Sequence, residues 1–319
     1  TLNVAVISDL HCRHSSSGED KDTWIKKEKM RRPINQHPVQ SLLKLIETEG
    51  ITADILLCPG DISDKTDPQG LVTGWSFLEE IESKLQAKSL IASLGNHDVD
   101  SRGIYNKYDY LDMPRNLKDN FPFNFAFEKK SYIADRFCFI KLEDILLFIF
   151  NSVHSHTNEE AAKEAIITDD ILEDIHNELE NLDRKFKYKI ALTHHHPIKH
   201  SNVGFTYKDS DFIEKGDKLL NILDRFNFQL FIHGHKHEPR LTIYNNIPVF
   251  ASGSFSSIRN LQTTNSKNYF HLITLNENNK KGIITNWEYT FGMGWNLSSS
   301  KLEHNIGFGY NGDFSELCN

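Results

Sequence analysis

The sequence contains 319 residues, of which 39% are hydrophobic and 25% are charged, proportions typical of a globular protein with a full core. No run of about 18 apolar residues is present, so we expect no transmembrane helix and no membrane partner. The net charge of −8, from 36 basic and 44 acidic side chains, argues against unselective coating of nucleic acid, which requires a basic face.

The cysteines point to a reducing compartment. Cys12, Cys58, Cys138 and Cys318 show no paired spacing. The first residues are neither basic nor followed by a small-residue cleavage site, so we expect no signal peptide. Free thiols are then the expected state, and we expect a cytoplasmic location.

The first third of the chain alternates strands and helices. Apolar runs predict strands over 4–7, 54–58 and 89–94 and amphipathic helices over 38–49 and 73–85. Such alternation favours a mainly parallel sheet, in which ligands bind at the carboxyl ends of the strands. A polar insertion over 13–37 carries several basic side chains. It is either a solvated loop or a flap that contacts an anionic substrate.

The middle of the chain interrupts this alternation of strands and helices and then resumes it. Residues 101–136 are rich in Tyr and Phe, and we expect an excursion over the site rim whose aromatic residues form a small core or, alternatively, stack on bases. Beyond it, the pattern predicts strands over 137–141, 145–150, 189–192 and 228–232 and helices from Thr168 onward and over 212–226.

The last third is expected to be β-rich. Asn-rich turns separate strands predicted over 241–244, 247–251, 269–275 and 282–290. We expect one catalytic domain over 1–290, with insertions near 13–37 and 101–136, and a C-terminal extension or surface tail over 291–319.

Five of the predicted strands end in side chains that bind metals. These are Asp9 and His11, Asp61 and Asp64, Asn96 and His97, the triplet His194-His195-His196, and His235 and His237. A single histidine in such a place is usually only a hydrogen-bonding surface residue, but five clusters that each follow an apolar run are not explained that way. Carboxylate, imidazole and amide donors suit two divalent ions of the Mn, Fe, Zn or Ni type, and they do not suit a thiolate zinc site.

These clusters carry a family resemblance. The stretches Asp9-x-His11, Gly60-Asp61-x-x-Asp64, Gly95-Asn96-His97-Asp98, His195-x-Pro197 and Gly234-His235-x-His237 resemble, in order, the five blocks of the calcineurin-like metallophosphoesterase superfamily. The resemblance covers about residues 1–275. It implies an α/β fold, a four-layer αββα sandwich of two mixed β-sheets flanked by helices.

The resemblance also implies the ligands of two divalent metal ions, with Mn the first choice and Fe, Zn or Ni as alternatives. The first ion would take Asp9, His11, Asp61 and His237, and the second would take Asp61, Asn96, His195 and His235. Asp61 would bridge them. His195 is chosen because it lies two residues before Pro197, and His194 and His196 remain alternatives. The Asp-x-His block argues against the purple acid phosphatase branch, which adds a tyrosine ligand.

The implied activity is hydrolysis of a phosphodiester, a cyclic nucleotide or another nucleotide, by attack of a hydroxide that bridges the metals. His97 would stabilise the phosphoryl group or protonate the leaving group, and Asp64 would orient His97. Asp64 is alternatively a loop cap. His154, His156 and His200 either line the pocket or are ordinary loop histidines, and Arg102 and Arg259 are candidates for a phosphate contact. The alternatives are a DNA or RNA nuclease module of a larger protein, and a non-catalytic interaction module.

Overall fold

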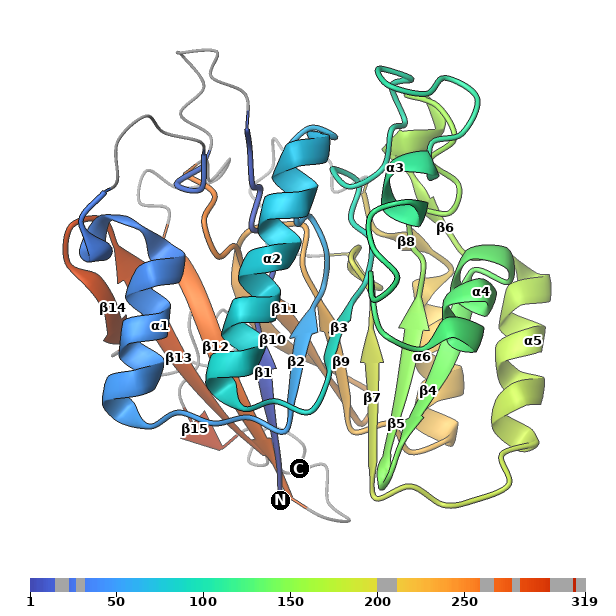
Figure 1. The fold of residues 1–319 in the computed structure, drawn as a ribbon. Helices are drawn as coiled ribbons and strands as arrows, with labels where there is room; N and C mark the ends of the chain where they lie inside the picture. The colour runs from blue at the N-terminus through green and yellow to red at the C-terminus, as the bar shows by residue number, and fades with distance from the viewer. Residues whose placement is uncertain are drawn as a thin grey trace.

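Two β-sheets packed face to face form the centre of the fold, and helices cover their outer faces (Figure 1). The computed structural model describes residues 1–14, 23–26, 32–199, 211–258, 267–276, 282–298 and 312–313. The layers run from α1 (Pro38–Glu49) and α2 (Pro68–Leu85), through the two sheets, to α5 (Asp169–Glu180) and α6 (Gly216–Arg225). The predicted four-layer sandwich of mixed sheets is confirmed.

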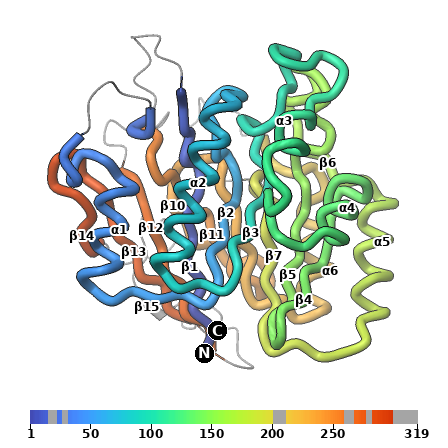
Figure 2. Tube along the Cα trace, in the orientation of Figure 1, coloured from blue at the N-terminus to red at the C-terminus, as the bar shows by residue number. Residues whose placement is uncertain are grey.

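The first sheet combines both ends of the chain. Its order is β14-β13-β12-β1-β2-β3, and β15 pairs with β13. Their bounds are β1 Leu2–Val6, β2 Ile55–Cys58, β3 Leu90–Ala92, β12 Asn268–Leu275, β13 Gly282–Thr290, β14 Gly294–Leu297 and β15 Gly312–Asp313. Strands β1, β2 and β3 are parallel, while β12 returns antiparallel to β1 (Figure 2). The segment expected to form an extension or tail thus contributes two strands to this sheet.

The second sheet comes from the middle of the chain. Its order is β10-β11-β9-β7-β5-β4. The bounds are β4 Phe137–Leu142, β5 Ile145–Phe150, β7 Tyr188–Leu192, β9 Leu230–His233, β10 Pro239–Tyr244 and β11 Ile247–Ser252. A separate small pair joins β6 Ala165–Ile166 to β8 Ile213–Glu214. Strands β5, β7 and β9 are parallel, so the residues that follow them meet at one edge.

The predicted helices are present as α1, α2, α5 and α6, and the first residues of α2 and α6 differ from the prediction. Their bounds are η1 Ile34–Gln36, α1 Pro38–Glu49, α2 Pro68–Leu85, α3 Asp112–Arg115, α4 Ala126–Ala134, η2 Ala161–Lys163, α5 Asp169–Glu180 and α6 Gly216–Arg225. Helix α2 begins earlier than expected because the Asp67 carboxylate accepts hydrogen bonds from the backbone of Gln69 and Gly70. Helix α6 begins later because the preceding residues form β8.

Alternation along β5 separates the two hydrophobic cores. Leu147 and Ile149 belong to the core that extends through the first sheet to α1 and α2. Leu146 and Phe148 belong to the core that packs against α5 and α6. Because neighbouring side chains on a strand point to opposite faces, a strand buried on both faces is apolar throughout.

The aromatic excursion is divided between core and surface. Phe121, Phe123 and Tyr132 are fully buried in the larger core, whereas Tyr105 and Tyr108 are 58% and 88% exposed. The Tyr132 hydroxyl accepts a hydrogen bond of 2.8 Å from the backbone of Leu94, just before the candidate site. The excursion is therefore fixed to the sheet by its buried aromatic residues, which join the main core instead of forming a separate one.

Part of the 13–37 insertion, His200, Arg259 and most of the segment after residue 298 lie outside the described residues. Within the described residues, no helix is long and apolar enough to cross a membrane.

Candidate metal centre

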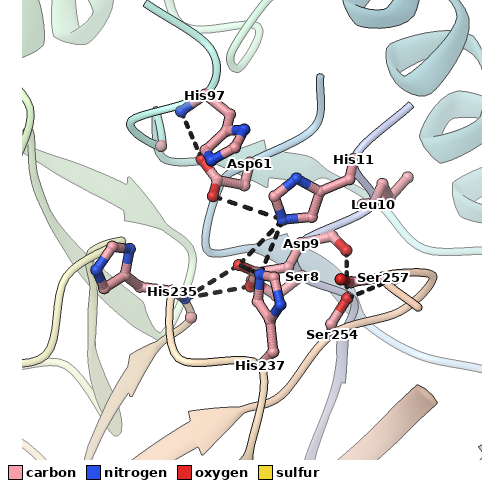
Figure 3. A network of polar contacts seen from close by, with 12 residues as sticks. Ser8, Asp9, Leu10, His11, Asp61, His97, His235, His237, Ser254 and Ser257 are labelled. Carbon is pink, nitrogen blue, oxygen red and sulfur yellow. Dashed lines mark hydrogen bonds and ion pairs between the residues drawn. The ribbon is translucent and has the colours of Figure 1, made fainter. Parts of the chain in front are cut away.

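The metal-binding side chains predicted from the sequence meet where the parallel strands of both sheets end. Asp9 and His11 follow β1, Asp61 and Asp64 follow β2, Asn96 and His97 follow β3, His194 and His195 follow β7, and His235 and His237 follow β9. Figure 3 shows the side of this cluster around Asp9 and Asp61. Within it, two sets of donor atoms that share Asp61 are each close enough to hold one ion, and His11, Asp64 and His97 form a further close group.

The first donor group consists of Asp9, His11, Asp61 and His237. The Nε2 atoms of His11 and His237 are 2.9 Å apart, and His237 Nε2 is 3.4 Å from Asp9 Oδ1. His11 Nε2 is 3.7 Å from Asp61 Oδ2. Metal bonds of about 2.1 Å at right angles place donors about 3.0 Å apart, and wider angles lengthen that distance toward 4.2 Å. The four side chains therefore fit one divalent ion.

The second donor group consists of Asp61, Asn96, His194 and His235. His194 Nε2 lies 3.3 Å from Asp61 Oδ2 and 3.0 Å from Asn96 Oδ1. His235 Nδ1 lies 3.1 Å from the same Asn96 oxygen and 3.2 Å from His194 Nε2. These distances also match neighbouring positions around one ion. The Oδ2 atom of Asp61 faces both groups.

The histidine in contact with Asp61 and Asn96 is His194, which the sequence left open as an alternative to His195. The His195 ring instead turns Nδ1 to the Ser152 hydroxyl, 2.8 Å away, and packs beside His235. Counting residues forward from the end of β7 gives His194, whereas counting back from Pro197 gives His195. His194 is the second residue after β7, as His235 is the second residue after β9.

The backbone of the donor residues is bent into the left-handed region. The φ angles are 53° at Asp9, 47° at His11, 52° at Asp61, 74° at His235 and 58° at His237. Such a conformation costs a non-glycine residue about 1–3 kcal/mol and occurs where function requires a particular side-chain direction. Here it occurs at five donor residues, which are thereby aimed at one another.

Hydrogen bonds select which carboxylate oxygen faces each donor group. The Ser8 hydroxyl donates to Asp9 Oδ2 at 2.5 Å, and the Ser254 hydroxyl donates to the Asp9 carbonyl at 2.7 Å (Figure 3). The backbone N–H of His97 donates to Asp61 Oδ1 at 2.8 Å, which leaves Oδ2 toward the donors. A Cβ atom at Gly95 would collide with Asp61, so a glycine is required for this approach. No sequence pattern indicated that Ser8 and Ser254 support the site.

His97 stands beside the donor groups and not within them. Its Nδ1 atom is 3.3 Å from Asp64 Oδ1 and 3.0 Å from the backbone nitrogen of Lys65. Its side chain is 28% exposed, so the ring is within reach of a substrate. Asp64 also lies 3.4 Å from His11 Nδ1 and, through its second oxygen, 3.4 Å from Arg13. Asp64 thus contacts a metal-type donor as well as His97.

Asp98 supports the loop. It is fully buried and accepts hydrogen bonds from the backbone of Ser63 and Gly95 at 2.8 and 2.9 Å. Burial and the neighbouring Asp61 raise the pKa of Asp98 to about 6.

The electrostatics of the centre favour a cation. Burial opposes ionisation of both Asp61 and His194, but their mutual attraction outweighs it. As a result, the pKa of Asp61 lies well below its usual range and the pKa of His194 is raised to about 9. Without other positive charge, the buried carboxylates thus hold a proton on an imidazole. A divalent ion would supply that positive charge and take the nitrogen lone pair.

The remaining predicted residues lie around this centre. His154 Nε2 is 2.8 Å from the carbonyl of Ile166, His156 is fully buried beside His195, and Arg102 is exposed. Arg13, which no sequence motif indicated, contacts the centre through Asp64.

Comparison with known proteins agrees with this geometry. The family model described as calcineurin-like phosphoesterase matches residues 2–239. No curated protein matches the sequence. A dimetal phosphatase from Danio rerio has a similar structure, with a TM-score of 0.52, 11% identity, and coverage of 91% of this chain and 99% of that one. A purple acid phosphatase from yellow lupin (Lupinus luteus) seeds has a TM-score of 0.53 and 15% identity, with 93% and 53% covered. At these identities the likeness shows a shared fold.

Proposed function

Because the chain belongs to the calcineurin-like phosphoesterase family, we propose that it is a dinuclear metal-dependent phosphodiesterase acting on a cyclic nucleotide or another nucleotide. One observation carries the proposal: Asp61 Oδ2 lies 3.7 Å from His11 Nε2 and 3.3 Å from His194 Nε2. A single carboxylate oxygen between two sets of buried donors is the arrangement that holds two ions side by side.

In this proposal the first ion is held by the first donor group and the second ion by the second donor group, with His194 in the place first given to His195. Mn remains the first choice, and Fe, Zn and Ni suit the same donors. When bound, two such ions lower the pKa of a water molecule toward neutrality and neutralise charge on the phosphoryl oxygens.

The side chains of the chain supply orientation and a proton. Asn96 is a neutral donor, so Asp9 and Asp61 alone bring negative charge to the two donor groups, and the centre keeps an excess of positive charge for an anionic substrate. His97 presents Nε2 to the substrate because its Nδ1 is engaged by Asp64 and Lys65. From there it would donate a proton to the leaving oxygen or a hydrogen bond to a phosphoryl oxygen.

The rim favours a diester over a monoester. A monoester dianion needs more positive contacts than a diester monoanion. The described rim offers His97, while Arg13 is turned to the Asp64 carboxylate.

A substrate panel tests the proposal. With Mn added, the purified chain is given bis-p-nitrophenyl phosphate, p-nitrophenyl phosphate, cyclic nucleotides and single-stranded DNA. We expect the diester and the cyclic nucleotides to be cleaved faster than the monoester. Preference for p-nitrophenyl phosphate would overturn the diester assignment, and metal binding without any turnover would favour a non-catalytic interaction module.

A nuclease is the second candidate, and the exposed aromatic loop favours it. Tyr105 and Tyr108 project to the surface, and Lys107 lies 4.9 Å from the Tyr108 ring centroid. The loop is fixed because the Asp100 carboxylate accepts three backbone hydrogen bonds, from residues 104, 105 and 106. Aromatic rings on a fixed loop can stack on successive bases. Cleavage of DNA alone in the panel would select this candidate.

A cytoplasmic location is also part of the proposal. It is supported by Cys12, Cys58 and Cys138, which are buried free thiols, as expected in a reducing compartment.

A further inference from the structure

We propose that His195 supplies a third imidazole to the second metal position, beside His194 and His235, and that Ser152 holds His195 in place. The inference rests on the proposed two-metal site and adds a ligand to it. The family motif gives that position one histidine from this stretch, whereas the fold brings two of the three consecutive histidines to it.

The three rings converge on one place. One nitrogen of each of His194, His195 and His235 lies within 4.8 Å of the other two. The ring centroid of His195 is 4.4 Å from that of His235 and 5.0 Å from that of His194. All three belong to the edge where β7 and β9 end side by side. Three imidazoles this close to one another form a nitrogen-rich cluster of the kind that suits a transition metal.

Ser152 fixes the direction of the His195 ring. The Ser152 hydroxyl lies 2.8 Å from His195 Nδ1, and it accepts the backbone N–H of His195 at 3.2 Å. With Nδ1 engaged, Nε2 is the atom that remains for a metal. Metal-binding histidines are usually held in this way, through a hydrogen bond at the other ring nitrogen.

His156 closes the space behind His195. The two rings meet edge to face with centroids 5.2 Å apart, and both side chains are almost completely buried. Neither ring nitrogen of His156 has a hydrogen-bond partner within the described part of the chain. The His195 ring therefore has a second buried imidazole packed against it and little room to turn away.

The consequence is a difference between the two metal positions. The first would have two imidazoles and two carboxylates, and the second would have three imidazoles, one amide oxygen and the shared Asp61. Carboxylate-rich sites suit Mn and Mg, whereas imidazole-rich sites suit Zn, Fe, Ni and Co. We therefore expect the second position to bind the borderline metals in preference to Mn, so that a mixed pair forms when both kinds are present.

The test follows Co²⁺ binding by visible absorption and calorimetry, in the full chain after removal of metals. His195→Gln should weaken binding at one of the two sites by at least about 10- to 100-fold and change the visible spectrum of that site. Ser152→Ala keeps the imidazole but removes its support, so it should weaken the same site by about 10-fold. His154→Gln is the matched control, because His154 lies in the same segment and bonds to a backbone carbonyl outside the centre.

Unchanged Co²⁺ affinity and spectrum in folded His195→Gln, with a raised KM for substrate, would overturn the inference and make His195 a substrate contact. If His195→Gln does not fold, Ser152→Ala carries the test, and normal Co²⁺ binding in that variant is the contrary result. Failure of the proposed function is distinguishable, because the unaltered chain would then bind fewer than two Co²⁺ ions.

Discussion

The Oδ2 atom of Asp61 lies 3.3 Å from Nε2 of His194, across the junction between the two sheets. Asp61 follows β2 of the first sheet and His194 follows β7 of the second. The proposed second metal position therefore exists only when the two sheets are packed together. Removal of the metals should accordingly lower the stability of the whole fold.

Substitution of Asp61 tests the bridge. Asp61→Asn replaces the shared carboxylate oxygen by a neutral amide, so we expect a fall of at least about 10²–10³ in kcat and loss of at least one bound metal. Elemental analysis of the purified variant, together with its turnover of bis-p-nitrophenyl phosphate, gives both quantities. Asp54→Asn is the control, since Asp54 accepts a backbone hydrogen bond at 2.8 Å far from the centre. Normal turnover by Asp61→Asn would exclude a dinuclear centre.

Substitution of His194 tests which histidine contacts Asp61. His194→Ala removes the Nε2 atom between Asp61 and Asn96, and we expect the second metal to be lost while the first stays bound. Metal content after dialysis measures this directly. His176→Gln, a surface histidine paired with Glu180 on α5, should keep both metals. Retention of both metals by His194→Ala would return the principal role to His195.

Substitution of His97 separates catalysis from metal binding. His97→Gln should keep both metals, because neither donor group includes His97. We expect its kcat to fall about 10²–10⁴-fold for diesters with alkyl leaving groups and less for p-nitrophenyl esters, whose leaving group needs no proton. Comparison of the two substrate types in one preparation measures the effect. A loss of metal would mean that His97 is itself a ligand.

Substitution of Asp64 should affect both metal binding and catalysis. Its carboxylate lies 3.4 Å from His11 Nδ1 and 3.3 Å from His97 Nδ1. Asp64→Asn should therefore weaken binding of the first metal by about 10- to 100-fold, because Asp64 orients a metal ligand. It should also lower kcat at saturating metal. Isothermal titration with Mn²⁺ gives the affinity. If Asp64→Asn has ordinary affinity and ordinary kcat, Asp64 is only a loop cap.

Chelation should destabilise the fold. An ion that binds only the folded chain stabilises it by about 2.7 kcal/mol when its free concentration is about 100 times Kd. We expect EDTA to lower Tm by several degrees and excess Mn²⁺ to restore it. The same scan on Asp61→Asn is the control, and its Tm should respond less to EDTA. An identical response in the two proteins would place the stabilising metal elsewhere.

Much of the fold was predictable because its signals are local. The period of apolar residues gave α1 and the strands β4, β5 and β7 to within a residue or two, and the blocks after the strands gave the donor types. The start of α2 was missed although Asp67 and Pro68, an N-cap followed by proline, are a local signal of a helix start. The start of α6 was missed because β8 forms by pairing with the distant β6.

The sequence by itself determined that carboxylates, imidazoles and one amide follow the strands of an α/β fold, since strand ends and residue types are properties of neighbouring positions. Only the tertiary structure decided which of His194 and His195 contacts Asp61. Beyond the last hydrogen-bonded residue of a strand, side-chain direction no longer alternates regularly. It is set by backbone angles such as the 53° of φ at Asp9, and by partners such as Ser152 that follow other strands.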